Sequence, residues 1–207
     1  MNMNEIDKVY YQLETAAHRA YNRGIQTGSG GNLSAKIPGT QNMIVKSSGG
    51  SFADCKQNGE GFVVTDFFGN LIEATGAKPT RESFLHGLLY QINPEIGGVV
   101  HTHSPWSIAW SFTQKELPMI TQHLKLKFGM PIPVVSVNSP MVRPEDRELI
   151  EPLFLENKKL PAFILVGHGI VAVGKDVLEA EHNAELVEET AQIAILNTIM
   201  LKLSILE

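Results

Sequence analysis

The chain has 207 residues, of which 43% are hydrophobic and 19% charged, and its formal net charge is −5. These values are typical of a globular protein with one substantial core, and the negative charge argues against a nucleic-acid partner. The single cysteine, Cys55, excludes an internal disulfide framework and fits a reducing compartment. The N-terminus is polar and no apolar run reaches the roughly 20 residues of a membrane span, so we expect a cytoplasmic protein with no membrane partner.

The first half of the chain is predicted to alternate helices and short strands. Apolar residues recur at helical spacing near the N-terminus, where Asn4 and Gly24 suit the two ends of a helix. The predicted elements are a helix over about 4–23, strands near 33–37 and from Asn42 onward, a hairpin with strands near 62–65 and 70–74, and a helix that opens at Pro79–Thr80 and closes at Asn93–Pro94.

The second half continues this mixture. Its predicted elements are a strand that ends in a histidine pair, a short helix over 106–112, a strand near 133–137, a helix over 144–156 that Pro152 bends, two strands in PAFILV and IVAVG, and a helix from Asp176 to the end. The last helix is apolar on more than one face, which predicts core burial and a subunit contact.

The order of these elements also predicts the architecture. Strands and helices do not follow a regular β-α-β rhythm, which favours an α/β sandwich with a mainly antiparallel sheet over a doubly wound parallel sheet. The sequence contains no repeat, low-complexity segment or linker, so we predict a single domain over 1–207.

Two histidines stand at the end of a buried strand, in the sequence VVHTHSPW. Residues i and i+2 of a strand share one face and lie roughly 6–7 Å apart, so His101 and His103 are expected to project together. Imidazole nitrogens bind zinc at about 2.0–2.1 Å, and both rings could reach one ion. The pair alone supplies too few ligands for a tight site, and two unrelated surface histidines are the alternative.

A third histidine, His168, ends another apolar strand in the sequence ILVGHG. The glycines on either side permit unusual backbone conformations and the close approach of another segment. With His101 and His103 it would form a tripod that leaves a position open, as a catalytic metal site requires. For His168 alone, the alternative is a core histidine bonded to a backbone carbonyl.

A carboxylate is expected beside this tripod. Glu82 stands near the first turn of the helix that leads into the histidine strand. The helix dipole favours a glutamate there in any case, and the same position suits a metal ligand or a base. His86, four residues later, is interpreted as a packing or supporting residue rather than a ligand. Cys55, in a polar loop, is interpreted as incidental rather than as a nucleophile.

Three loops rich in small residues suit an anion, namely GSGGNLS, KSSGGS and KPTRE. Their backbone N–H groups and hydroxyls can cradle phosphate oxygens, while Lys46 and Arg81 add positive charge. None of them matches the P-loop pattern, and Gly/Ser turns without a ligand are the common case.

The motifs GNLS, KPTRE, VVHTHSPWSIA and LVGHG occur in the order and spacing of the class II aldolase/adducin family, which the chain resembles from about residue 8 to about residue 195. That family includes fuculose- and rhamnulose-phosphate aldolases, ribulose-5-phosphate 4-epimerase, a methylthioribulose-1-phosphate dehydratase and adducin, a cytoskeletal protein. The resemblance implies a three-layer α/β/α sandwich around a central, mainly antiparallel sheet, assembled as a homotetramer.

The resemblance also implies a set of site residues. One divalent metal per subunit, with Zn²⁺ ahead of Mn²⁺, Co²⁺ and Mg²⁺, is expected on His101, His103 and His168, and Glu82 is expected to be a resting ligand and the catalytic base. The positions that match the phosphate-binding loops of the family are Gly31, Asn32, Ser48, Gly49, Thr80 and Arg81. Arg81 departs from the small hydroxyl residue that is usual in the family, which suggests a stronger or differently placed anion contact.

The expected activity is that of a metal-dependent lyase, which cleaves a phosphorylated ketose by a retro-aldol reaction through a metal-stabilised enediolate. The alternatives within the superfamily are decarboxylation of a phosphorylated 3-oxo sugar acid and epimerisation or dehydration of a pentulose phosphate. The alternative from another class is a non-catalytic, adducin-like interaction module, which would have no reason to keep three histidines and the glutamate in register.

The chain departs from the family at the proton donor. Aldolases of the family use a tyrosine from the neighbouring subunit shortly after the segment that matches Leu117–Pro118, and this chain has no tyrosine after Tyr90. His123 is the predicted replacement acid. Lys125 is a predicted contact for a substrate carboxylate, which would suit a decarboxylase. The epimerase matches less well, because it carries aspartate where this chain has Glu82.

Overall fold

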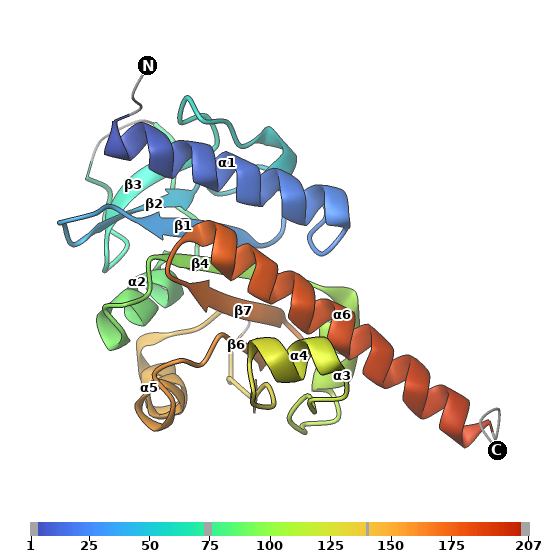
Figure 1. Ribbon diagram of the computed structural model, residues 1–207. Coiled ribbons are helices and arrows are strands. Elements are labelled where there is room, and N and C mark those ends of the chain that lie inside the picture. Colours follow the sequence, from blue (N-terminus) through green and yellow to red (C-terminus); the bar gives the residue numbers. More distant parts are fainter. Residues whose placement is uncertain (1–3, 73–75, 140, 204–207) are drawn as a thin grey trace.

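A seven-stranded sheet forms the middle layer of the computed structural model, which describes residues 4–72, 76–139 and 141–203 (Figure 1). The strands are β1 (Asn32–Lys36), β2 (Asn42–Lys46), β3 (Phe62–Asp66), β4 (Gly98–Thr102), β5 (Val134–Val135), β6 (Ala162–Leu165) and β7 (Gly169–Gly174). Their order across the sheet is β3-β2-β1-β4-β7-β6-β5. Every neighbouring pair is antiparallel except β5 and β6, which confirms the mainly antiparallel sheet.

Helices cover both faces of this sheet. They are α1 (Glu5–Arg23), α2 (Ser83–Ile92), α3 (Pro105–Ser111), α4 (Gln122–Lys127), α5 (Arg147–Glu156) and α6 (Val177–Lys202), with 3-10 turns at Phe52–Asp54 and Pro144–Asp146. Helices α1 and α6 pack on one face, and α2 and α5 pack on the other (Figure 1). None of the described helices is long and apolar enough to cross a membrane.

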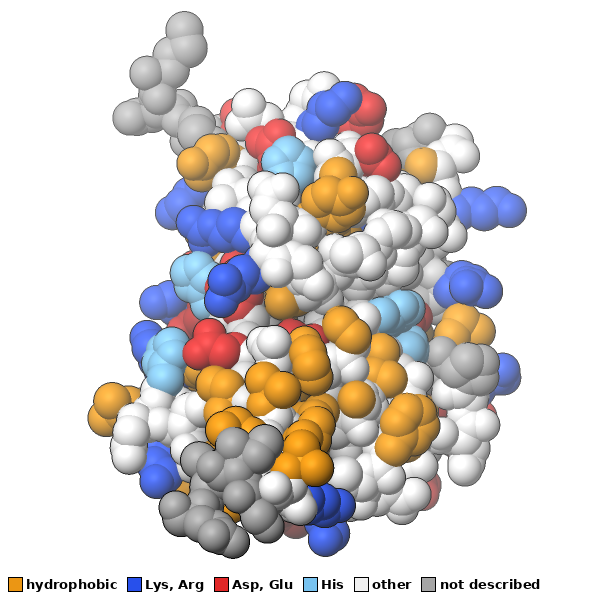
Figure 2. Space-filling view, turned by 90° about the vertical axis from the view of Figure 1, so that its right-hand side faces the viewer, with side chains coloured by type: hydrophobic (Ala, Val, Ile, Leu, Met, Phe, Trp, Pro, Cys, Tyr) orange, Lys and Arg blue, Asp and Glu red, His pale blue; other side chains and the backbone are white. Residues whose placement is uncertain are grey.

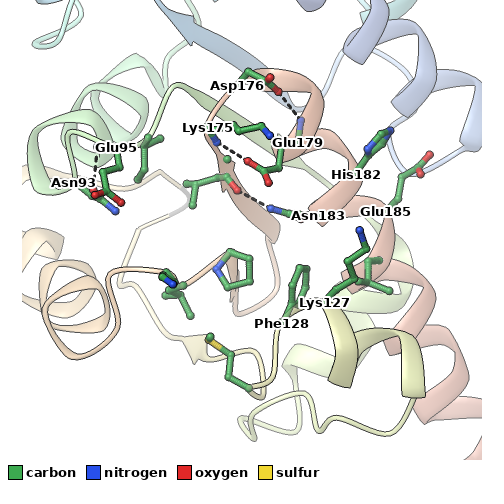
Figure 3. Close-up of a pocket in the computed structure, with 18 of the residues that line it drawn as sticks. Asn93, Glu95, Lys127, Phe128, Lys175, Asp176, Glu179, His182, Asn183 and Glu185 are labelled. Carbon is green, nitrogen blue, oxygen red and sulfur yellow. Dashed lines mark hydrogen bonds between the residues drawn. The ribbon is translucent and has the colours of Figure 1, made fainter.

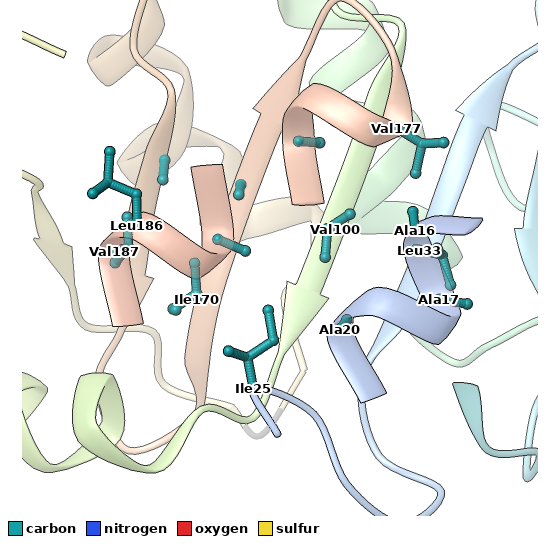
Figure 4. Close-up of a cluster of buried hydrophobic side chains, with 14 of the residues drawn as sticks. Ala16, Ala17, Ala20, Ile25, Leu33, Val100, Ile170, Val177, Leu186 and Val187 are labelled. Atoms are coloured by element: carbon teal, nitrogen blue, oxygen red, sulfur yellow. The ribbon is translucent and has the colours of Figure 1, made fainter. Parts of the chain in front are cut away.

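The alternation of side chains along the strands divides the core into two layers. On β4, Val100 joins the cluster under α1 and α6, whereas Val99 joins the cluster against α2 and α5. The first cluster is built largely from small and branched residues, among them Ala16, Ala17, Leu33, Ile170 and Val187 (Figure 4). The α/β/α sandwich expected from the sequence is therefore present.

Helix α1 begins and ends at the capping residues that the sequence indicated. The side chain of Asn4 accepts a hydrogen bond from the backbone N–H of Asp7 at 2.8 Å, and Gly24 terminates the helix in the left-handed region at φ 79°. The helix predicted to open at Pro79–Thr80 instead begins at Ser83. The chain before it is held extended against the end of β2, because Pro79 forms a bridge with Ser47 and the N–H of Thr80 donates to the carbonyl of Lys46 at 3.1 Å.

Three other segments differ from expectation. The second arm of the predicted hairpin is reduced to a bridge between Thr65 and Leu71, and residues 73–75 lie outside the described part of the chain. The strand expected near 133–137 is confined to Val134–Val135. Helix α4 was not anticipated, since it is short and its start depends on one cap, the Thr121 hydroxyl that accepts from the N–H of Leu124. Residues 204–207 of the predicted last helix also lie outside the described residues.

Gly87, in the middle of α2, offers a test of this packing. An alanine in a helix interior normally stabilises by about 0.5–1 kcal/mol relative to glycine. Here a Cβ at Gly87 would lie only 1.8 Å from the backbone carbonyl oxygen of Phe67. We expect Gly87→Ala to lower the free energy of unfolding by about 1–3 kcal/mol in a denaturant titration. The matched control is Gly50→Ala, whose Cβ would have no neighbour within 4 Å. A Gly87→Ala protein as stable as the wild type would contradict the close approach of α2.

Candidate metal centre and adjoining cavity

His101 is buried on the side of β4 that faces α2. Its Nδ1–H donates to the carbonyl oxygen of Ile170 on β7 at 2.8 Å, so Nε2 carries a lone pair that is directed at the neighbouring side chains. Burial lowers the pKa of His101 to about 4, which keeps the ring neutral. His103 follows directly after the strand, and its backbone N–H donates to Oε1 of Gln26 at 2.7 Å.

His168 reaches the same place from the turn between β6 and β7. Gly169 after it adopts φ 142°, and a Cβ there would lie 2.0 Å from the carbonyl oxygen of Thr102. Gly31, at φ 61°, likewise leaves no room for a Cβ beside the carbonyl oxygen of His101. The glycines of GHG and of GSGGNLS therefore allow backbone segments to come together behind the histidines, as their sequence context indicated.

Glu82 completes the group from the residue that precedes α2. Its Oε2 lies 3.4 Å from Nε2 of His101 and accepts a hydrogen bond from Nδ2 of Asn32 at 2.8 Å, while its Oε1 lies 3.5 Å from Nε2 of His168. Burial is the largest influence on the Glu82 pKa and raises it. The combined effect of His101, the Asn32 hydrogen bond and His168 outweighs burial, so the pKa is lowered and the carboxylate is ionised.

The four side chains fit a divalent cation. One ligand atom from each of Glu82, His101, His103 and His168 lies within 4.8 Å of the others. A tetrahedral ion with bonds of about 2.0–2.1 Å separates its ligands by about 3.3 Å, and the Nε2 atoms of His101 and His168 are 3.3 Å apart. Among the described residues, the buried Oε1 of Glu82 has no hydrogen-bond partner. The four side chains therefore fit a set of metal ligands better than a hydrogen-bond network in which every polar atom has a partner.

A cavity of about 550 Å³ opens beside this cluster. Its wall includes Glu82, His103 and His168 together with every residue that the sequence assigned to phosphate binding, namely Gly31, Asn32, Ser48, Gly49, Thr80 and Arg81. The three loops that were far apart in the sequence therefore meet at one cavity with the cluster. This wall also contains Ser29, Gly30, Ile108 and Gly167, which lie within the quoted motifs but were not assigned to ligand binding, and Met141, which lies in none of them.

Lys46 brings a buried cation to this cavity. Its Nζ donates to the carbonyl oxygen of Ser47 at 3.3 Å, and burial lowers its pKa. An anion in the cavity would favour the charged form of this amine. Cys55 lies near Lys46 but is buried, and burial raises the pKa of its thiol to about 12. This agrees with the interpretation that Cys55 is not a nucleophile.

Gln26 is a supporting residue that the sequence did not indicate. It is buried, its Oε1 accepts from the backbone of His103, and its Nε2 donates to the carbonyl oxygen of Thr27. It thereby holds the loop before β1 against the end of β4. The only signal in the sequence was a polar residue directly after the end of α1, which is common on any protein surface.

The remaining two predicted site residues lie elsewhere in the chain. His123 and Lys125 stand on exposed positions of α4, and neither lines the cavity beside the cluster. His123 instead lines a second cavity of about 840 Å³ with Lys127 and Phe128, between α4 and the N-terminal half of α6 (Figure 3). Within one chain, therefore, neither residue contributes to the wall of the cavity beside the cluster.

Comparisons with known proteins give the following relations. The model of the family "Class II Aldolase and Adducin N-terminal domain" matches residues 12–195. The 3-oxo-tetronate 4-phosphate decarboxylase of Escherichia coli (strain K12) is 32% identical over 187 residues, which are 88% of this chain and 84% of the relative. The L-fuculose phosphate aldolase of Methanococcus maripaludis is 34% identical over 200 residues, which are 97% of each. The crystal structure of YgbL from Escherichia coli matches with a TM-score of 0.76 at 28% identity, over 93% of this chain and 91% of that one.

The donor set predicts that the protein binds one Zn²⁺ per chain. Loss of one ligand should be costly because it leaves an incomplete coordination shell. We expect His168→Ala to weaken Zn²⁺ binding by at least about 100-fold, measured by competition with a chromophoric chelator. His182→Ala is the matched control, since His182 is exposed and lies outside the cluster. Equal Zn²⁺ affinity in both variants would show that the cluster is not the metal site.

Proposed function

The chain belongs to the class II aldolase and adducin family, and from this premise we propose that it is a metal-dependent enzyme that breaks a carbon–carbon bond in a small phosphorylated sugar. One observation carries the proposal. Three members of the Glu82/His101/His103/His168 cluster, namely Glu82, His103 and His168, line one cavity together with the anion-binding loops. A ligand with a phosphate at one end and a carbonyl at the other would engage both, which a non-catalytic interaction module does not require.

The loops hold the phosphate end in this proposal. Lys46 and Arg81 supply the positive charge, and Ser48 and Thr80 supply hydroxyl donors on the same wall. Binding of the phosphate fixes the distance from that end of the substrate to the cluster, so the reacting carbons lie in one defined position relative to Glu82.

A divalent cation, Zn²⁺ in the first instance, supplies a Lewis acid that polarises the substrate carbonyl. Glu82 handles the proton. Its Oε2 accepts a hydrogen bond from Asn32, whereas its Oε1 has no hydrogen-bond partner among the described residues, so Oε1 is the atom that takes and returns a proton. The lowered pKa of Glu82 means that this carboxylate begins the reaction ionised, as a base.

Two reactions of this kind differ in the acid–base groups they need. Retro-aldol cleavage requires a base for the hydroxyl that becomes an aldehyde and an acid for the carbon that keeps the electrons. Decarboxylation of a 3-oxo acid releases CO₂, which takes no proton, so only the carbon must be protonated. The ionised Glu82 would take this proton from a water molecule, leaving hydroxide, and pass it to the carbon. Among the described residues that line the cavity, Glu82 is the only carboxylate.

These features favour decarboxylation of a phosphorylated 3-oxo sugar acid as the reaction of this chain. The relative named for that activity supports the proposal. Retro-aldol cleavage of a ketose phosphate is the second candidate, because the aldolase relative aligns over nearly the whole of both chains. In the second case the missing acid would have to come from outside the chain.

A homo-oligomer is part of this proposal. The C-terminal part of α6 extends beyond the sheet (Figure 1), and hydrophobic side chains gather on the lower half of the face shown in Figure 2. The exposed apolar residues of that part of α6 and of the residue that follows it are Ile193, Leu196, Ile199, Met200, Leu201 and Leu203. A second copy would bury such a surface, and it could bring His123 and Lys125 of one chain to the cavity of the next.

The reaction is tested with the Zn²⁺-loaded protein and four substrates: 3-oxo-tetronate 4-phosphate, fuculose-1-phosphate, rhamnulose-1-phosphate and ribulose-5-phosphate. We expect CO₂ from the first, lost with EDTA and recovered with added Zn²⁺. Glu82→Gln should lower kcat by about 10²–10⁴-fold because the proton-transfer group is removed. Glu60→Gln is the control, since Glu60 is exposed and pairs with Lys56. Aldehyde release from fuculose- or rhamnulose-phosphate without CO₂ would move the enzyme to aldol cleavage, and inactivity of the metal-loaded protein on all four would remove both proposals.

The shared site is tested by mixing two variants. His123→Ala and Glu82→Gln proteins should each have low activity, whereas their co-expressed mixture should regain about a quarter of wild-type activity, because a random assembly pairs intact Glu82 with an intact neighbouring His123 in that share of sites. The measurement is the specific activity of the purified hybrid. Full activity of His123→Ala alone would remove this residue from the mechanism.

A further inference from the structure

A continuous chain of buried hydrogen bonds leads away from Glu82 into the protein. Nδ2 of Asn32 donates to Oε2 of Glu82, and Oδ1 of the same amide is bonded to Nε2 of His86. On its other side, Nδ1 of His86 is bonded at 2.7 Å to the hydroxyl of Ser34, which is bonded at 2.7 Å to the hydroxyl of Tyr90. Each of these residues is less than one-tenth exposed, and His86 is fully buried.

The sequence builds this chain from two periodicities that match. Glu82, His86 and Tyr90 are four residues apart, so they lie along one face of α2 and its N-terminal end. Asn32 and Ser34 are two residues apart on β1 and point to the face of the sheet on which α2 packs. The side chains on this face of α2 therefore alternate with those of β1 along the chain of hydrogen bonds: Glu82 contacts Asn32, His86 contacts Asn32 and Ser34, and Tyr90 contacts Ser34.

The direction of every bond in this chain follows from the charge of Glu82. An ionised carboxylate only accepts, so Asn32 must present its Nδ2–H₂ to Glu82 and its Oδ1 to His86. Nε2 of His86 must then carry the hydrogen, and Nδ1 must accept from the Ser34 hydroxyl. The Ser34 oxygen in turn accepts from the Tyr90 hydroxyl. Burial lowers the pKa of His86 to about 3, which agrees with a neutral ring that has one N–H.

The opposite direction would be unfavourable. If Nδ1 of His86 carried the hydrogen, Nε2 would need a donor, and the Asn32 amide would have to turn its oxygen toward the Glu82 carboxylate. Oδ1 of Asn32 and Oε2 of Glu82, both hydrogen-bond acceptors, would then face each other in a buried site, which is unfavourable. In this state the Ser34 hydroxyl would accept from Nδ1–H and donate to Tyr90, so the hydrogen of the buried Tyr90 hydroxyl would have no acceptor within this chain of hydrogen bonds.

We propose that His86, held as the Nε2–H tautomer by Ser34 and Tyr90, is a positioning residue that fixes the Asn32 amide and, through it, the orientation of the Glu82 carboxylate. His86 does not touch the cavity or the metal donors. Its effect is to commit Oε2 of Glu82 to Asn32, so that Oε1 stays free beside His168. The consequence for catalysis rests on the proposed function, whereas the orientation of Glu82 does not.

The tautomer is measured directly with the wild-type protein labelled with ¹⁵N-histidine. A long-range ¹H–¹⁵N NMR spectrum should show His86 neutral at pH 7 with its hydrogen on Nε2, and His86→Gln identifies the signal by its disappearance. A hydrogen on Nδ1, or a charged ring, would overturn the proposal whatever reaction the enzyme catalyses.

The influence on Glu82 is measured with three variants. His86→Leu removes the donor to Asn32, and we expect it to weaken Zn²⁺ binding and to lower kcat by about 10–100-fold each, the range found when a group behind a metal ligand is lost. His86→Gln keeps an N–H near Nε2 and should recover most of both losses. Tyr90→Phe keeps the packing and removes only the far end of the chain, so it should give a smaller fall in the same two quantities, with KM changed less than kcat.

Several controls separate positioning from folding. Tyr21→Phe, at an exposed position of α1, should change neither quantity, and Tm is recorded for each variant. If His86→Leu does not fold, Tyr90→Phe and the NMR spectrum still decide the question. Zn²⁺ affinity within twofold of wild type in both His86→Leu and Tyr90→Phe would overturn the proposal. Normal Zn²⁺ and NMR results with no turnover of any substrate would overturn the proposed function instead.

Discussion

The antiparallel pairing of β1 with β4 is the constraint on which the site depends. Its register sets Asn32 opposite His101, at the ends of adjacent strands. Because side chains alternate along a strand, this register places both side chains on the face covered by α2, and Glu82 lies on that face directly before the helix begins. A shift of one residue would turn Asn32 and Ser34 into the other core layer and leave His86 and Tyr90 facing apolar side chains. The positions of the proposed metal donors, of the loop proposed to bind phosphate and of the hydrogen bonds behind Glu82 therefore all depend on this one register.

Much of this arrangement could be predicted from the sequence, because it is local or periodic. Capping at Asn4 and Gly24, the buried strands and the two histidine motifs are patterns within a few residues of one another. The start of α2 could not be predicted, because the extended conformation of Pro79 and Thr80 is imposed by β2, more than thirty positions earlier. Gln26 was missed for a similar reason, since its partner is the backbone of His103. The places of His123 and Lys125 depend on α4 and, in our proposal, on a neighbouring chain, about which one sequence holds no pattern.

The protein tolerates several buried polar groups to make this site. Lys46, Glu82 and His101 are almost completely enclosed, and a buried charge or polar group without a partner is costly. For two of these groups the protein limits the cost with one fixed hydrogen bond, from Nδ1 of His101 to Ile170 and from Asn32 to Oε2 of Glu82. Their other atoms face the donor cluster, where Nε2 of His101 lies 3.3 Å from Nε2 of His168 and Oε1 of Glu82 has no hydrogen-bond partner among the described residues. The fixed partner determines orientation, and the free atom is the one available to a ligand. In each of these side chains, one atom is used for the fixed hydrogen bond and the other is available for ligand binding.

The donor residues come from three separate places in the chain: the residue before α2, the end of β4 and the turn between β6 and β7. The space between Glu82 and His168 is closed only when the central strands have paired. A partly folded chain does not hold these ligands together, so a cation that needs all of them would bind only the folded protein. Its binding free energy would therefore stabilise the folded sheet relative to partly folded states and make the last folding step more cooperative. For the metal-dependent enzyme proposed above, metal supply would then govern both the amount of folded protein and the rate of turnover.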